Sequence, residues 1–255
     1  MLNVLFDLGN TVLMFPAGGL ETEGKFSPKR RSVFESLVKV TYDSLARSGI
    51  DVKWPSFFKV YKAVRAQQIT QQKQTLREYD MKERLARILN SSGFKISQTS
   101  EIIQQALEDY FEAYAKHVTI QKDTRRLLEK LQLNRKLGLV TNFAYPPCIY
   151  HMLNKFNLNH IFDAVIISGQ IGWVKPSPKI FQTALRKLES KANQTIFVGD
   201  DPETDIKGAR NAGMKTVLLS SENTCKDADR TITHLSELPN AIKELEHANA
   251  RQERA

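Results

Sequence analysis

Cysteine and long apolar runs are scarce in this sequence of 255 residues. The two cysteines, Cys148 and Cys225, have neither metal-ligand spacing nor partners for a disulfide framework, so we expect a reducing, cytoplasmic compartment. No apolar run approaches the roughly 18 residues that cross a bilayer, so we expect no membrane partner. The residues after Met1 lack the basic, apolar and cleavage segments of a secretory signal, and we expect no such leader.

The chain is basic, with 37 lysines and arginines against 28 aspartates and glutamates and a net charge of +9. These basic residues are spread along the sequence, and only Lys29-Arg30-Arg31 forms a compact run. No zinc finger, RNA-binding strand signature or basic zipper accompanies the charge, so nucleic acid is not the favoured partner. Attraction of a small anionic, phosphorylated substrate explains the charge equally well. The sequence leaves the oligomeric state open.

The first apolar stretch, residues 2–6, predicts a buried strand that ends at Asp7. Ligands of open α/β sheets bind at the carboxyl ends of the strands. An aspartate at that end, followed by the small-residue turn Gly9-Asn10-Thr11, is therefore well placed for chemistry. We take Asp7 as the residue around which the rest of the site must be found.

Residues 28 to about 116 change character, because their apolar residues recur at helical spacing with no convincing strand. Ser27-Pro28 is a helix start signal, Gly49 and Gly93 are end signals, and Thr99 or Ser100 opens the last helix. We therefore predict an all-helical subdomain of about four helices, inserted after the first strand.

After the helical region, strand and helix patterns alternate. Strands are predicted at 137–140, 164–167, 195–198 and 216–219, with helices at 123–133, 147–154, 178–188 and 204–212. This alternation indicates a parallel sheet with helices on both faces. The fold prediction is an α/β, Rossmann-like, three-layer core formed by 1–15 and 117–248, with a helical cap at 16–116. The polar residues 249–255 are predicted to be a frayed tail.

Polar residues follow three further strands or loops and can converge on Asp7 at one edge of the sheet. They are Thr141-Asn142, Lys175, and the acidic run that begins at Asp200. A carboxylate can attack a phosphoryl group, provided that the charge is neutralised by a lysine and by magnesium held on carboxylates. A hydroxyl group can orient the phosphoryl oxygens. Asp7, Asp200, Lys175 and Thr141 supply these parts.

These stretches, in this order, resemble the four motifs of the haloacid dehalogenase (HAD) superfamily of hydrolases. Residues 7–11 are similar to its first motif, which usually reads Asp-x-Asp-x-Thr, and 139–142 to its second. The segment 175–181 is similar to the third motif and 197–213 to the fourth, which runs on as Asp205-Ile-Lys-Gly-Ala-Arg-Asn-Ala-Gly. The helical insert occupies the place of the cap in subclass I of this superfamily.

The resemblance implies a phosphatase-like hydrolase in which Asp7 is the nucleophile. Magnesium would be held by Asp7, the Gly9 carbonyl and Asp200. Thr141 and Lys175 would hold the phosphoryl group, and Thr11 and Asn142 belong to the same substrate-binding motifs. Asp205 would position Lys175 or a metal-bound water.

One position departs from the pattern, because the second aspartate of the first motif is replaced by Gly9. In phosphatases of this superfamily that aspartate protonates the leaving group. Three hypotheses follow: a magnesium-dependent phosphatase whose acid comes from elsewhere (Glu23, Lys25, the Tyr145 hydroxyl or the substrate), a dehalogenase-type carbon–halogen hydrolase, and a non-catalytic binder of phosphorylated ligands or proteins. General acid–base catalysis typically raises the rate about 10²–10⁴-fold. Its loss should slow the hydrolysis of alkyl phosphates most, because their leaving groups are poor.

Overall fold

A parallel sheet forms the centre of the structure, a computed structural model that describes residues 1–15, 28–222 and 224–252. Its strands are β1 (Asn3–Phe6), β4 (Leu137–Thr141), β5 (Ala164–Ile167), β6 (Thr195–Gly199), β7 (Lys215–Leu219) and β8 (Arg230–Ile232). They lie in the order β5-β4-β1-β6-β7-β8, and every neighbouring pair is parallel. The predicted α/β class and parallel sheet are confirmed.

The register of β1 shows how one strand joins two core layers. Val4 lies opposite Leu137 of β4 and Ile196 of β6. Val4 and Phe6 belong to one buried apolar cluster and Leu5 to another, as the twofold alternation of a strand requires. All three side chains are fully buried. The strand is therefore apolar throughout because both of its faces are covered.

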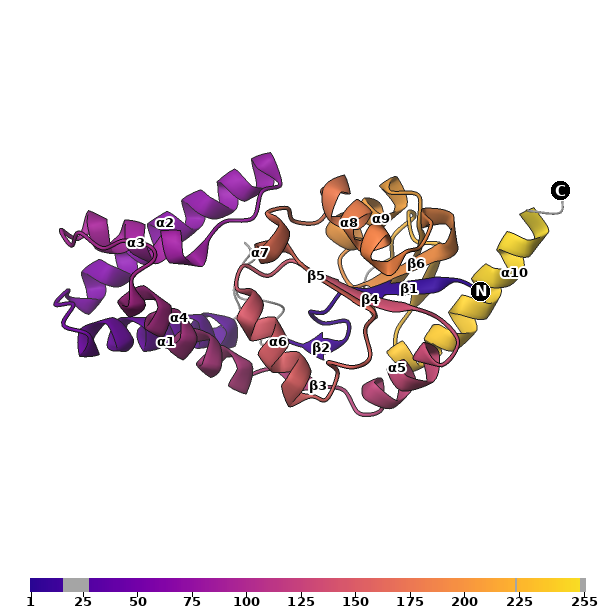
Figure 1. Ribbon diagram of the computed structural model, residues 1–255, viewed down its shortest axis with the longest axis horizontal. Coiled ribbons are helices and arrows are strands. Elements are labelled where there is room, and N and C mark those ends of the chain that lie inside the picture. The colour runs from indigo at the N-terminus through magenta and orange to yellow at the C-terminus, as the bar shows by residue number, and fades with distance from the viewer. Residues whose placement is uncertain (16–27, 223, 253–255) are drawn as a thin grey trace.

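Helices cover both faces of the sheet (Figure 1). The Leu5 cluster includes residues of α8 (Pro178–Leu188) and α9 (Gly208–Asn211). The opposite cluster includes residues of α5 (Thr124–Gln132), α6 (Pro146–Lys155) and α10 (Leu238–Gln252). Two 3₁₀ turns, η2 (Ala192–Gln194) and η4 (Leu235–Glu237), complete the connections among the described residues. These layers match the three-layer core expected from the sequence.

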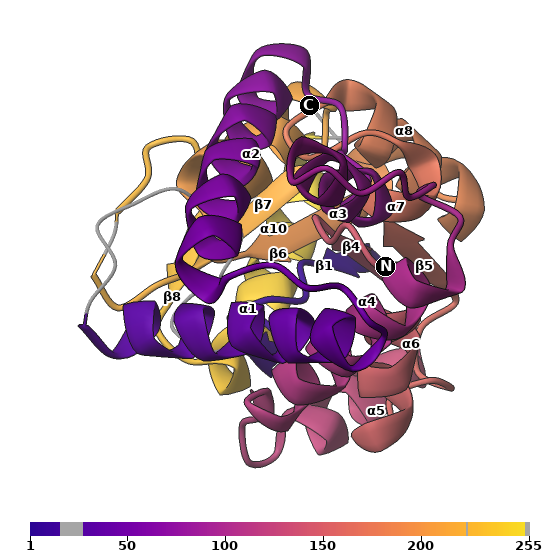
Figure 2. The same cartoon turned by 90° about the vertical axis from the view of Figure 1, so that its left-hand side faces the viewer.

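The helical insert consists, in its described part, of α1 (Pro28–Arg47), α2 (Trp54–Thr75), α3 (Met81–Ser91) and α4 (Glu101–Lys116). Figure 2 looks onto α1 and α2 with the strands behind them, so the insert stands at one end of the sheet. Ser100 caps α4 by accepting a hydrogen bond from the Ile102 amide (3.3 Å), as the sequence predicted. The predicted cap residue Ser27 lies outside the described residues. Within the described ranges, no helix has the length and apolarity needed to cross a membrane.

A short ribbon connects the insert to the core. β2 (Leu13–Met14) pairs antiparallel with β3 (Thr119–Ile120), so the segments that precede and follow the helices lie side by side. Each strand has two residues, too few for a sequence pattern to reveal, and neither strand was predicted.

The remaining elements refine the sequence prediction at its edges. The predicted helix 204–212 begins earlier, as a π-helical turn η3 (Pro202–Lys207) that continues into α9. A short helix α7 (Ser168–Ile171), which was not predicted, follows β5 directly. α10 runs to Gln252 and so enters the segment 249–255 that was predicted to fray, whereas 253–255 lie outside the described residues.

Candidate active site

Asp7 follows β1 directly and is 6% exposed. Its amide donates to the Val198 carbonyl (2.8 Å), so the residue is held by the neighbouring strand β6. Beyond it the chain turns sharply, with the amides of Val12 and Leu13 both donating to the Leu8 carbonyl (3.0 and 2.8 Å). This turn fixes the direction in which the Asp7 carboxylate leaves the sheet.

Lys175 connects two buried carboxylates. Its Nζ lies 2.5 Å from Asp7 Oδ1 and 2.6 Å from Asp205 Oδ1. Lys175 is 4% exposed and Asp205 1%, so these charges are removed from water together. Burial lowers the pKa of the Lys175 ammonium, but Asp205 and Asp7 outweigh that effect and raise it above its ordinary value. Lys175 therefore carries its charge at any pH of interest.

Asp200 completes a cluster of three carboxylates at this edge of the sheet. One carboxylate oxygen from each of Asp7, Asp200 and Asp205 lies within 4.8 Å of the others. Burial, together with repulsion from Asp205 and Asp200, raises the pKa of Asp7 from 3.8 to about 8 despite the attraction of Lys175. Burial and Asp205 likewise raise the pKa of Asp200 to about 6. Among the described residues, the single Lys175 ammonium does not balance the three carboxylates, so this part of the cluster is short of positive charge.

The acidic residues in and after the loop that follows β6 have two different roles. Asp201 caps the following turn, its carboxylate accepting from the amides of Glu203 (2.9 Å) and Thr204 (2.7 Å). Asp205 instead reaches back toward Lys175, and its Oδ2 accepts from the Asp201 amide (3.2 Å). A Cβ on Gly199 would lie 2.6 Å from the Asp205 Cβ, so only glycine permits this close approach.

The residues at the end of β4 hold the loop that carries Lys175. Thr141 is buried at the same edge of the sheet as Asp7, since Phe6 pairs with Leu139 in the adjoining strand. The Asn142 side chain accepts from the Lys175 amide (2.7 Å) and donates to the Lys175 carbonyl (3.1 Å). The bond between Lys175 and Pro176 is cis. Asn142 therefore positions Lys175, and its contact with a substrate stays a prediction.

Two predicted residues, Thr11 and Gly9, lie in the first turn, and among the described residues no hydrogen bond joins either of them to the charged cluster. Thr11 is 1% exposed, and its Oγ1 has no hydrogen-bond partner among the described residues. Gly9 is half-buried, and its carbonyl stays a predicted metal ligand. Glu23 and Lys25, considered above as sources of an acid, lie outside the described residues.

Sequence reasoning missed a connection between the helical insert and the core. The Ser168 hydroxyl donates to Glu78 Oε2 and accepts from the Phe143 amide (2.7 Å). Glu78 lies in the linker between α2 and α3, and its amide donates to the Gly172 carbonyl (3.1 Å). The available signal in the sequence was Ser168 itself, a serine at the start of a helix that directly follows a strand. The sequence does not indicate its partner, because Glu78 is 90 residues away.

Asn10 is a second residue that the sequence did not single out. Its side-chain amide donates to Asp200 Oδ2 (3.3 Å), and its backbone has a φ of 58°. Asparagine tolerates this left-handed conformation better than most residues. Asn10 therefore forms the turn after Gly9 and orients Asp200.

The chain resembles known proteins in both sequence and structure. A family model described as haloacid dehalogenase-like hydrolase matches residues 51–219. The chain is 33% identical over 106 residues to a glyceraldehyde 3-phosphate phosphatase of Methanothermobacter thermautotrophicus, which covers 42% of this chain and 46% of that protein. The chain thus spans about half the length of the curated relatives it matches.

Two solved structures have the same fold. A 2-haloacid dehalogenase from Pseudomonas syringae pv. Tomato DC3000 superposes with a TM-score of 0.67 at 22% identity, covering 96% of this chain and 99% of that one. A HAD phosphatase from Thermococcus onnurineus superposes with a TM-score of 0.60 at 23% identity, covering 95% and 98%. At these identities the likeness concerns the fold alone.

Proposed function

The chain belongs to the haloacid dehalogenase-like hydrolase family, and on that premise we propose that it is a magnesium-dependent phosphatase that acts through an aspartyl-phosphate at Asp7. The observation that carries the proposal is the buried Lys175, which contacts Asp7 and Asp205 together. The relative named as a glyceraldehyde 3-phosphate phosphatase supports a small phosphorylated substrate.

The residues present fit a magnesium ion. Mg²⁺ prefers oxygen ligands and is usually bound by one or two carboxylates together with water and phosphate oxygens. Asp205 has both carboxylate oxygens engaged, one with Lys175 and one with the Asp201 amide. Asp7 and Asp200 are then the carboxylates left to hold the ion, with the Gly9 carbonyl as a third ligand. A bound cation would supply the positive charge that the cluster lacks and that an incoming phosphate dianion requires.

The reaction follows from this arrangement in two displacements. An Asp7 carboxylate oxygen attacks phosphorus while the bond to the leaving oxygen breaks, and the leaving group takes that electron pair. Water then attacks the phosphorus of the aspartyl-phosphate, releasing inorganic phosphate and restoring Asp7. Lys175 stays charged throughout and neutralises the phosphoryl oxygens, and the Thr141 hydroxyl orients them. Asp205 holds Lys175 in place.

Gly9 sets a limit on the substrates that this site handles well. It stands where the leaving group would otherwise meet a carboxylic acid, whose help is typically worth about 10²–10⁴-fold. Phosphates of poor leaving groups, such as alkyl esters, depend most on that help. We therefore expect aryl and acyl phosphates to be turned over faster than alkyl phosphates.

The proposal is tested by phosphate release from p-nitrophenyl phosphate and from a panel of sugar and nucleotide phosphates, with magnesium. Wild type should turn over the aryl ester, and Asp7→Asn should lose about a thousandfold or more, as expected for a nucleophile. Asp201→Asn is the matched control, because this neighbouring aspartate caps a turn and an asparagine can still cap it.

Each failure has a distinct meaning. No turnover of any phosphate by wild type would contradict a phosphatase and favour the non-catalytic binder. Metal-independent release of chloride from 2-haloacids would favour the carbon–halogen hydrolase. If Asp7→Asn and Asp201→Asn retain equal phosphatase activity, Asp7 is not the nucleophile.

A further inference from the structure

The space beside Gly9 is occupied by an aromatic ring. A Cβ built on Gly9 would lie 3.2 and 3.3 Å from Cδ2 and Cε2 of Phe15, and the third nearest atom, at 3.8 Å, belongs to the same ring. The two shorter contacts are tighter than ordinary van der Waals distances. The Phe15 ring therefore stands where a side chain of residue 9 would begin.

Other aromatic residues hold this ring in place. Phe15 packs edge-on against Tyr114 (centroids 5.8 Å apart) and against Phe143 (6.1 Å). Tyr114 and Phe143 are themselves in contact at 5.7 Å. Tyr114 comes from α4 of the insert and Phe143 from the loop after β4, two residues beyond Thr141. The helical insert and the core thus build one aromatic cluster beside the first turn.

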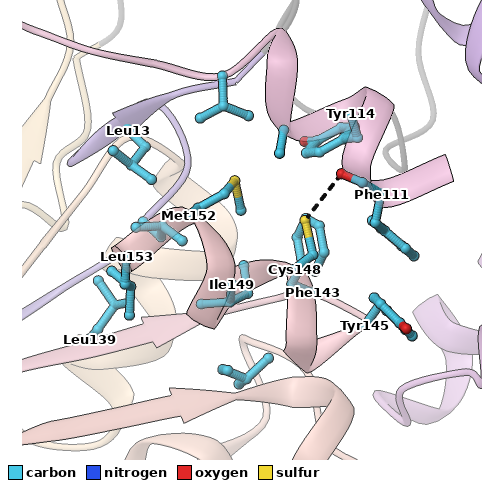
Figure 3. Close-up of a cluster of buried hydrophobic side chains, with 14 of the residues drawn as sticks. Leu13, Phe111, Tyr114, Leu139, Phe143, Tyr145, Cys148, Ile149, Met152 and Leu153 are labelled. Carbon is cyan, nitrogen blue, oxygen red and sulfur yellow. Dashed lines mark hydrogen bonds between the residues drawn. The ribbon is translucent and has the colours of Figure 1, made fainter. Parts of the chain in front are cut away.

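Phe111 and Tyr145 extend this aromatic cluster as packed core. Figure 3 shows Tyr114 and Phe111 of α4 beside Phe143 and Tyr145. Phe111 stacks on Tyr145 with centroids 4.5 Å apart, and the Tyr145 hydroxyl accepts from Gln104 (3.0 Å) in the same insert helix. Phe111, Tyr114, Phe143 and Tyr145 are all buried, whereas Phe15 keeps partial exposure. Phe15 is thus the most exposed residue of this group.

We infer that Phe15, backed by Tyr114 and Phe143, forms the wall against which the leaving group rests, and that the site selects aryl phosphate monoesters. The inference depends on the proposed phosphatase function and gives it a substrate class. An apolar wall cannot donate a proton, so a favourable leaving group must depart as a stable anion. A phenolate does so, keeping the electron pair of the broken P–O bond on its oxygen and taking its proton from water after release. Its ring also matches the aromatic wall in shape and polarity.

The test compares two phosphates that need no acid but differ in the leaving group. p-Nitrophenyl phosphate releases an aromatic anion, and acetyl phosphate releases a small non-aromatic one. Phe15→Leu keeps apolar volume and removes the ring, so the ratio of kcat/KM for the aryl ester to that for acetyl phosphate should fall about three- to tenfold. Tyr114→Leu, on a different element, should lower the ratio in the same direction. Phe156→Leu, at a partly buried phenylalanine in the same apolar cluster, is the matched control and should leave the ratio unchanged.

A second experiment examines whether the ring displaces an acid. The substrate is glycerol 3-phosphate, an alkyl ester, and the variants are Gly9→Asp, Phe15→Ala and the double variant. Because the ring and the new carboxylate compete for one space, Gly9→Asp alone should gain less than tenfold in kcat. The double variant should gain about a hundredfold, the lower end of general acid catalysis. The two substitutions are then strongly non-additive.

The outcomes separate the inference from the function on which it depends. If wild type hydrolyses both activated phosphates through Asp7 and Phe15→Leu leaves their ratio unchanged, the aromatic wall is wrong while the phosphatase stands. A double variant no better than Gly9→Asp would overturn the idea that Phe15 displaces an acid. If wild type hydrolyses neither phosphate, the proposed function fails and the inference fails with it.

Discussion

The charge imbalance of the carboxylate cluster predicts that Asp7→Asn stabilises the metal-free protein. Asp7 is buried beside Asp200 and Asp205, and its pKa is raised from 3.8 to about 8 by burial first and by these neighbours next. An asparagine fills nearly the same volume and has no charge to bury. Lys175 keeps Asp205 as its counter-ion at 2.6 Å, so the substitution does not leave the ammonium unpaired.

The magnitude follows from proton linkage. At pH 7 the Asp7 carboxyl group is ionised in the unfolded chain but protonated in the folded one, because its folded pKa is about 8. Taking up this proton lowers the free energy of unfolding by about 1.4 kcal/mol for each pH unit above the unfolded pKa of 3.8. The cost to wild type is therefore about 4 kcal/mol at pH 7. Asp7→Asn removes this cost but also loses the bond to Lys175, so its net gain in stability is smaller. Because the folded pKa lies above the unfolded one, the penalty is absent below about pH 4 and grows until about pH 8. We expect Asp7→Asn to gain about 2–4 kcal/mol at pH 7, or roughly 5–15 °C in Tm.

The assay is thermal and urea unfolding with a chelator present at pH 4 and pH 7, for wild type, Asp7→Asn and the surface control Asp51→Asn. The gain of Asp7→Asn should nearly vanish at pH 4, and Asp51→Asn should gain nothing at either pH. Adding magnesium should stabilise wild type more than Asp7→Asn, because only the native carboxylate set binds it fully. A variant no more stable than wild type at pH 7, or one that gains equally at both pH values, would refute the reasoning.

Three further substitutions test other parts of the site. Ser168→Ala removes the acceptor of the Phe143 amide, so kcat should fall about tenfold with a smaller change in KM, measured by steady-state kinetics. Asn10→Gly keeps the positive φ but removes the bond to Asp200, and the magnesium concentration for half-maximal activity should rise about 10–100-fold in a metal titration. Gly208→Ala would place a Cβ 2.7 Å from a phenylalanine ring of α8 and should cost about 1–3 kcal/mol in urea unfolding.

The sequence predicts this fold well where the signal is local. The continuous apolar runs at 137–140 and 195–198 indicate strands because both faces of the sheet are covered, and Ser100 marks the start of α4 because its side chain caps it. The convergence of Asp7 with Lys175 is also predictable, since parallel strands end at one edge and both residues lie near that edge.

What the sequence could not predict depends on contacts between distant segments. The β2–β3 ribbon is too short to show periodicity, and its pairing joins Leu13 to Ile120. The bond between Ser168 and Glu78 requires the insert to lie against a core loop, and no sequence pattern encodes that docking. Gly9 signals a missing acid, but only the three-dimensional structure shows that the Phe15 ring fills the place of its side chain.

The central position of β1 has a consequence for how the protein folds. Its partners β4 and β6 lie far along the chain, and Asp7 and Lys175 are separated by 168 residues. Pairings of such long range form slowly, whereas the helices between them rely on nearer contacts. We therefore expect α1–α4 to acquire protection from hydrogen exchange before β1 does, in a pulse-labelling refolding experiment. A chain shortened before β6 would still contain Asp7 but would lack the strand that holds it. The Asp7 carboxylate therefore reaches its final position late, after most of the protein already exists.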